Sequence, residues 1–187
     1  MTERLSSLAQ KAIDEILGLS RYRVDVHECD HFLDVLRFRA SESLSQPWRY
    51  EVTVTCAASI ASSEVMLKPA SFTFQTPLFD GSPAVPVRTV YGVVDTFRRI
   101  SVSGDEITYA LRIVPRIALM QHTQRSEVYL NLSVPEVVEQ ILRAHGLEGA
   151  DFEFRLSQHY PVRELITQWR ETDLEFIQRL LAGQVFP

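Results

Sequence analysis

The chain has 187 residues, of which 45% are hydrophobic and 23% are charged, and its formal net charge at neutral pH is −5. This is the composition of an ordinary globular protein, and it excludes a disordered chain. The negative charge argues against a general binder of nucleic acid or of anionic membranes, because both need a cationic surface. No apolar run has the length of a membrane span, so we predict no stable membrane insertion.

Residues 1–20 are predicted to form an amphipathic helix, because apolar residues recur there at intervals of three and four: Leu5, Leu8, Ala12, Ile13 and Ile16. Charged residues interrupt this segment throughout, so it is not a secretory signal peptide. The two cysteines, Cys29 and Cys56, do not form a disulfide framework and favour a reduced compartment. We therefore expect cytoplasmic assembly.

Residues 21–118 are predicted to form an antiparallel β-barrel, because the hydrophobic period changes to two. A hairpin between Val87 and Pro115 is the clearest part, with its turn at Ser103-Gly104-Asp105. Several strands joined by short polar turns are typical of a closed or nearly closed barrel. The inward residues are expected to be Tyr22, Val24, Val26, Leu36, Phe38, Ala40, Tyr50, Val52, Val54, Cys56, Phe72, Phe74, Val90, Gly92, Val94, Thr96, Ile107, Tyr109, Leu111 and Ile113.

Residues 119–187 are predicted to form part of a mixed α/β domain, so the fold class is α+β and mainly antiparallel β. Two capping boxes, Ser133 with Glu136 and Thr172 with Glu175, indicate helix starts. The first helix is expected to stop at Gly146, and Gly183 to provide a left-handed cap after the second. The alternation of Phe152, Phe154 and Leu156 predicts a further strand.

One motif could carry chemistry: His27-Glu28-Cys29-Asp30-His31 has the H-E-x-x-H spacing of zinc hydrolases. On a helix the two histidines would share one face and bind zinc, with the glutamate as general base. The preceding residues alternate with period two, so this segment is interpreted as a strand that runs into a polar turn. We therefore predict no catalytic residue, no cofactor and no metal ligand, and keep the zinc hydrolase as the alternative.

Other polar residues are assigned structural roles. Arginines of the hairpin are interleaved with acids and predict a solvated face: Arg98, Arg99, Arg112, Arg116 and Arg125 among Asp95, Asp105 and Glu106. Arg163, Arg170 and Glu171 lie beside the second capped helix, where an Arg–Glu pair could lock one element against another. His122, His145 and His159 each lie near the end of an element and are expected to be exposed or satisfied locally.

Five segments in order resemble one family: LSQPWRYEV from Leu44, YGVV from Tyr91 with Val114-Pro115-Arg116, SVPEVVEQIL from Ser133, YPVRE from Tyr160 and RETDLEF from Arg170. Together they are similar to the VgrG spike proteins of type VI secretion, whose head resembles the baseplate hub of contractile phage tails. The resemblance covers about Arg21 to Leu181.

The resemblance implies a non-enzymatic structural role. A family head consists of a tube-like barrel and an adjoining mixed domain, forms a trimer, caps a ring tube and meets baseplate components. It further implies export by the type VI machine itself. The second barrel and needle of the family do not follow Leu181 here, so a truncated member or fragment is expected. An oligonucleotide-binding barrel is a third hypothesis, although no nucleic-acid partner is predicted.

Overall fold

The computed structural model describes residues 20–76, 84–104 and 106–183, which fall into two compact units divided between Pro115 and Arg116. The helix predicted within residues 1–20 lies outside the described residues, as does Asp105 of the predicted hairpin turn. The described part is mainly antiparallel β, as the sequence predicts. No helix among these residues is long and apolar enough to cross a membrane.

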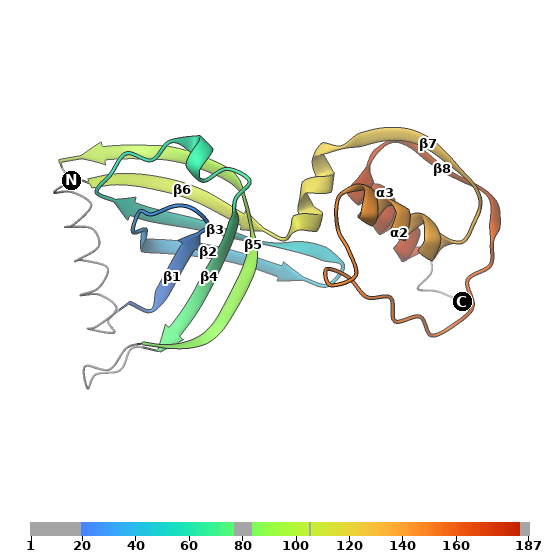
Figure 1. The fold of residues 1–187 in the computed structure, drawn as a ribbon, viewed down its shortest axis with the longest axis horizontal. Helices are drawn as coiled ribbons and strands as arrows, with labels where there is room; N and C mark the ends of the chain where they lie inside the picture. Colours follow the sequence, from blue (N-terminus) through green and yellow to red (C-terminus); the bar gives the residue numbers. More distant parts are fainter. Residues whose placement is uncertain (1–19, 77–83, 105, 184–187) are drawn as a thin grey trace. The chain divides into compact units, whose positions relative to one another are not determined.

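The first unit is a six-stranded antiparallel sheet with the strand order β1-β4-β5-β6-β3-β2. Figure 1 shows that this sheet is strongly curved. The described part holds no backbone ladder between the two outermost strands, β1 and β2. Its elements are β1 (Tyr22–Val26), β2 (Asp34–Ser43), β3 (Gln46–Cys56), the 3-10 helix η1 (Ser62–Glu64), β4 (Pro69–Thr76), β5 (Val85–Ser103) and β6 (Glu106–Val114).

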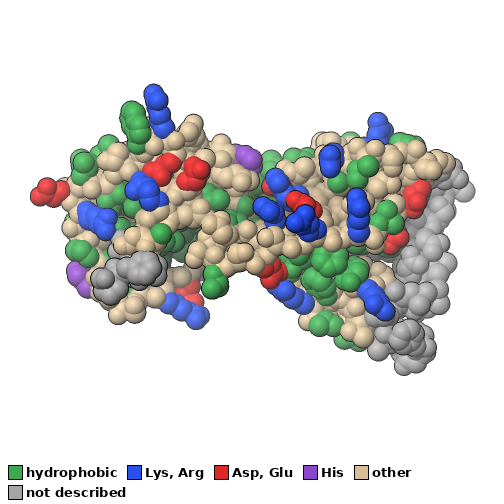
Figure 2. Space-filling view, turned by 180° about the vertical axis from the view of Figure 1, so that it is seen from behind, with side chains coloured by type: hydrophobic (Ala, Val, Ile, Leu, Met, Phe, Trp, Pro, Cys, Tyr) green, Lys and Arg blue, Asp and Glu red, His purple; other side chains and the backbone are tan. Residues whose placement is uncertain are grey.

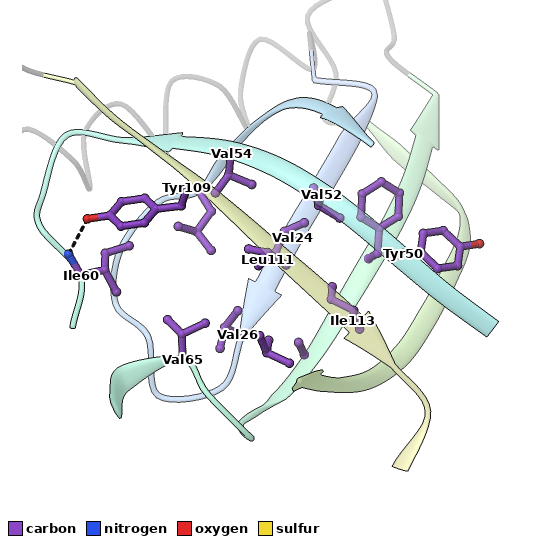
Figure 3. Packing of buried hydrophobic residues seen from close by; sticks show 14 of the residues in the cluster. Val24, Val26, Tyr50, Val52, Val54, Ile60, Val65, Tyr109, Leu111 and Ile113 are labelled. Atoms are coloured by element: carbon purple, nitrogen blue, oxygen red, sulfur yellow. Dashed lines mark hydrogen bonds between the residues drawn. The ribbon is translucent and has the colours of Figure 1, made fainter. Parts of the chain in front are cut away.

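The concave side of this sheet holds the core, which the period-two alternation predicts. Val52, Val54 and Ile113 are almost completely buried, and neighbouring strands supply further apolar side chains (Figure 3). Tyr109 also lies in the core, and its hydroxyl oxygen accepts a hydrogen bond of 2.9 Å from the Ile60 N–H. This bond satisfies a buried polar group that would otherwise be costly.

An aromatic cluster connects the two outermost strands across the core. The ring of Phe38 on β2 lies 4.9 Å from Tyr22 on β1 and 4.9 Å from Phe72 on β4, measured between ring centroids. The hydroxyl of Tyr50 donates to Glu42, which also accepts from Arg88 at 2.8 Å and 3.0 Å. Burial and this carboxylate raise the pKa of Tyr50 to about 12. Side chains therefore hold together strands that share no ladder.

The predicted pattern is wrong at Leu36, whose exposed fraction is 56% although it was expected to point inward. The register of β2 against β3 shifts between Val35 and Arg37, so Leu36 is the extra residue of a β-bulge. A bulge resets the alternation, and Val35 joins Phe38 against the core instead. Ala40 keeps the phase of Phe38 but is also exposed.

The second unit is a two-stranded antiparallel ribbon with two helices packed against one face, as Figure 1 shows. Its elements are the 3-10 helix η2 (Arg116–His122), β7 (Gln124–Leu132), α2 (Val134–Ala144), β8 (Arg163–Thr172) and α3 (Asp173–Ala182). Apolar side chains of both helices meet the inward residues Tyr129 and Ile166 of the ribbon. The strand predicted at Phe152, Phe154 and Leu156 is wrong, because the first two pack on the core without any ladder and Leu156 is exposed.

The capping predictions are confirmed at the start of α3. The Glu175 N–H donates to the Thr172 hydroxyl at 3.2 Å, and the Thr172 N–H donates to the Glu175 carboxylate at 2.8 Å. At α2 the Glu136 carboxylate accepts from the Ser133 N–H at 2.7 Å. The α2 helix ends before Gly146, whose φ is +71°, whereas Gly183 has right-handed helical angles and not the predicted left-handed ones.

Gly92 on β5 lies at a close approach between neighbouring strands of the sheet. A Cβ atom at this position would lie 2.3 Å from the Val114 carbonyl oxygen and 2.7 Å from the Trp48 ring. A Gly92→Ala substitution is therefore expected to lower the free energy of unfolding by about 2–3 kcal/mol, as overpacked cores do. Denaturant titration measures this, with Gly149→Ala as the matched control, because nothing lies within 4 Å of its added Cβ. Equal stability of the two variants would contradict the crowding.

Candidate functional site

The H-E-x-x-H segment does not form the helix that zinc chemistry needs. Strand β1 ends at Val26, residues 27 and 28 form a turn, and Glu28 has a φ of +60°. Glu28 pairs with Lys68, whereas His31 approaches Glu64 at 3.6 Å. No group of three or more His, Cys, Asp or Glu side chains among the described residues is arranged to hold a metal ion. The predicted turn is confirmed, and the geometry gives the zinc hydrolase alternative no support.

The two cysteines both lie at the core of the first unit. Cys56 is buried, and burial raises the pKa of its thiol. Cys29 is half-buried and packs against the same core. Neither is part of a disulfide, and both contribute to the core as small side chains.

A buried carboxylate organises the second unit. Asp173 is the first residue of α3, and its side chain is 1% exposed. Its Oδ2 atom lies 2.6 Å from His145 Nε2 and 3.1 Å from Arg125 Nε, while Oδ1 accepts from Gln168 Nε2 at 2.8 Å. The Asp173 N–H donates to the Thr123 carbonyl at 2.9 Å. One side chain thus joins β7, the end of α2, β8 and the start of α3.

Two members of this network, His145 and Arg125, have other roles than the sequence predicts. His145 is bonded to a residue 28 positions away and is neither exposed nor satisfied locally. Arg125 belongs to β7 and pairs with Asp173, so it is not part of a solvated hairpin face. Arg112 also departs from that prediction, because its guanidinium forms a salt bridge with the buried carboxylate of Asp95.

The sequence prediction does not include Gln168, and it includes Asp173 only within the segment RETDLEF. A signal for Gln168 exists in the sequence, since Ile166 points inward and the strand period of two places Gln168 on the same face. Gln168 is completely buried and donates to the Glu171 carbonyl at 3.2 Å as well as to Asp173. Its Oε1 atom has no hydrogen-bond partner among the described residues. For Asp173 the signal is a carboxylate in the first helical turn, where the helix dipole favours it.

Removing the charge of Asp173 is expected to destabilise the second unit. Asp173→Asn leaves the Arg125 guanidinium and the His145 ring facing a neutral amide, so we expect a loss of about 2–4 kcal/mol in the free energy of unfolding. Chemical denaturation measures the change. Asp151→Asn, an exposed carboxylate 3.8 Å from Arg116, serves as the control and should lose less than about 1 kcal/mol. A similar loss in both variants would contradict the organising role.

An ion pair locks α3 to β8, as the sequence suggested for this region, but its cation differs from the expected one. Arg179 on α3 donates to Glu171 at 2.6 Å and 3.0 Å, and also to the Thr167 carbonyl at 3.0 Å. Arg163 is exposed, and Arg170 lies over the Trp169 ring with its guanidinium carbon 5.3 Å from the ring centroid. The lock therefore joins a strand to the helix that directly follows it.

The lock predicts a pH dependence. The bond from Arg179 holds the pKa of Glu171 below its usual range, so this stabilisation is present above the unfolded pKa and is lost as the pH falls through the lowered folded pKa. Glu171→Gln is expected to reduce the decline in the free energy of unfolding between pH 6 and pH 3 by about 1 kcal/mol at most, because Arg179 is half exposed and water screens the pair. Urea titrations at each pH measure this. Glu164→Gln, an exposed carboxylate, should keep the original decline.

The face of the β7–β8 ribbon opposite the helices exposes apolar side chains. Leu130 lies directly opposite Leu165 in the register, and Trp169 has an exposed fraction of 67%. Isolated exposed apolar residues are normal, but a contiguous group typically marks an interaction site. We name this group the apolar ribbon face: Val128, Leu130, Leu165 and Trp169.

Comparison with known proteins identifies the fold and the family. Residues 41–184 match the phage tail baseplate hub (GPD) family. The chain belongs to this family. A solved structure of the E. coli c3393 protein, described as a component of the type VI secretion system with structural similarity to the T4 tail proteins gp27 and gp5, is 35% identical and superposes with a TM-score of 0.75. The match covers 85% of this chain and 42% of that one.

Curated relatives in the family are spike proteins. The type VI secretion system spike protein VgrG4b of Pseudomonas aeruginosa is 31% identical over 82% of this chain, and VgrG3 of Vibrio cholerae is 29% identical over 83%. The matches span 18% and 15% of those proteins, so this chain corresponds to less than a fifth of their length. The 43 kDa tail protein of prophage MuSo2 from Shewanella oneidensis, 12% identical with a TM-score of 0.57, shares the fold over 87% of this chain and 50% of its own length. The predicted resemblance to the VgrG spike proteins is confirmed.

Proposed function

We propose that the chain is a hub module of a type VI secretion spike, which assembles with copies of itself or with other spike subunits. Membership of the baseplate hub family carries this proposal. As the resemblance to the VgrG spike proteins implies, the assembled form is a trimer that caps a ring tube and contacts baseplate components. The module is put together in the cytoplasm and leaves the cell with the machine. Its role is mechanical and needs no catalytic centre or cofactor.

The proposal includes a closed tube domain over residues 21–118 and a mixed domain over residues 119–187. Closure is supported by side chains from strands that share no ladder: the rings of Tyr22 and Phe38 meet at 4.9 Å, and Glu42 of β2 binds Arg88 of β5. A sheet whose edges come together leaves fewer unpaired backbone groups available for wrong partners. A closed tube also resists bending better than an open sheet, which suits a module that transmits force.

The apolar ribbon face is proposed as the surface through which copies associate. One face of a two-stranded ribbon is already covered by α2 and α3, while Leu130, Leu165 and Trp169 face outward. Burial of such side chains is favourable in proportion to the area removed from water. Trp in particular is enriched at the centres of protein interfaces.

Self-association tests this proposal directly. Sedimentation equilibrium of the whole chain is expected to give a mass three times that of one chain. The double substitution Leu165→Gln with Trp169→Gln should shift the mass to that of one chain, because it makes the apolar ribbon face polar. Leu156→Gln with Val162→Gln is the control, since both residues are exposed but lie outside this face. A single-chain mass for the unaltered protein at high concentration would contradict the proposal.

A further inference from the structure

A groove of about 640 Å³ lies on the outer face of strands β2, β3, β6 and β5. Alternation along the strands defines this face. Arg37 and Arg39 flank the inward Phe38, and Arg112 is next to the buried Leu111. Together with Arg98 of β5, these residues supply four guanidinium groups to the groove. We call this site the arginine groove: Arg37, Arg39, Arg98 and Arg112.

The strand register places the four arginines in two rows across the sheet. In the first row Arg37 and Arg98 lie at opposite ends, with Thr53 and Ala110 between them. In the second row the order is Arg39, Glu51, Arg112 and Thr96. Neighbouring strands are about 4.8 Å apart, so the two ends of a row are separated by about 14 Å.

The buried carboxylate of Asp95 positions the Arg112 side chain. The register of β5 shifts between Val94 and Thr96, so Asp95 is the extra residue of a bulge, and its side chain is 1% exposed. Its carboxylate accepts from Arg112 at 2.8 Å, 3.1 Å and 2.8 Å. This paired geometry fixes the plane of the guanidinium. The Arg112 side chain remains 35% exposed.

The outer arginines have unused hydrogen-bonding capacity. The side chains of Arg39 and Arg98 make no hydrogen bond or ion pair with any residue that the structure describes, and the Arg37 side chain donates only to the Thr53 hydroxyl at 3.3 Å. Four guanidinium groups face the two carboxylates of Glu51 and Asp95, which leaves a surplus of two positive charges. Figure 2 shows Lys and Arg side chains grouped around acidic ones on the first unit. The whole chain, by contrast, has a net charge of −5.

We propose that the arginine groove binds an extended, acidic segment of a protein partner. Guanidinium groups form paired hydrogen bonds with carboxylates, and a preorganised fork loses little conformational freedom on binding. The span of about 14 Å between Arg37 and Arg98 equals about four residues of extended chain, at roughly 3.4 Å per residue. The groove therefore selects acidic residues at positions i and i+4. Ala110 gives the segment an apolar contact between these two arginines, and Ile100 lies two residues beyond Arg98 along β5.

The same geometry disfavours nucleic acid. Binding of a phosphate backbone depends on the number of phosphates that Lys and Arg neutralise, and this groove has a surplus of only two positive charges. Glu51 stands between Arg39 and Arg112 and repels a chain of phosphates. A segment with two separated carboxylates can avoid this glutamate.

Fluorescence anisotropy tests the proposal with a labelled octapeptide that carries glutamates at positions i and i+4 among serine and valine. The whole chain is expected to bind it, and binding should weaken as salt is added. The double substitution Arg37→Glu with Arg98→Glu should weaken binding at least tenfold. Arg155→Glu with Arg163→Glu is the matched control, because both arginines are exposed and lie in the second unit. Circular dichroism verifies that each variant is folded.

Three outcomes would overturn the proposal. One is absence of binding by the unaltered chain, and another is equal binding by the groove variant and the control. The third is tighter binding of a single-stranded oligonucleotide that the groove substitutions abolish, which would assign the groove to phosphate. A glutamine version of the peptide is expected not to bind. None of these results depends on self-association, so this test and the sedimentation test fail independently.

Discussion

The first unit depends on contact between aromatic rings on strands that share no backbone ladder. Phe38 lies 4.9 Å from both Tyr22 and Phe72, so the edges of the six-stranded sheet are joined through its core. Such ring pairs contribute about 0.5–1.5 kcal/mol each beyond the area that they bury. The curvature that brings them together also separates an apolar inner face from a polar outer face, on which the arginine groove lies.

The second unit uses a buried charge for a comparable purpose. A two-stranded ribbon is marginal by itself, and here Asp173 ties both of its strands to α2 and α3. A buried carboxylate is tolerable only with several donors, and Arg125, His145 and Gln168 supply them. Because the helices cover one face of the ribbon, the remaining face is free to display Leu165 and Trp169.

The described polar side chains that could carry chemistry make structural contacts. The one motif with catalytic spacing, at His27 and His31, lies in a turn whose polar side chains pair separately. The buried carboxylates of Asp95 and Asp173 form salt bridges with arginines. The curated relatives are spike proteins, and the family is that of the baseplate hub.

The sequence by itself determined the local features: the period-two strands, the capped start of α3 at Thr172 and the end of α2 before Gly146. Each depends on residues within a few positions of one another. Tertiary structure alone decided the bulges that turn Leu36 outward and bury Asp95, the choice of Arg179 as the partner of Glu171, and the gathering of four arginines on one face. The physical reason is that strand register and side-chain partners depend on segments far apart in the chain. The hydrophobic period and the residue spacing within one segment do not predict which other segment pairs with it.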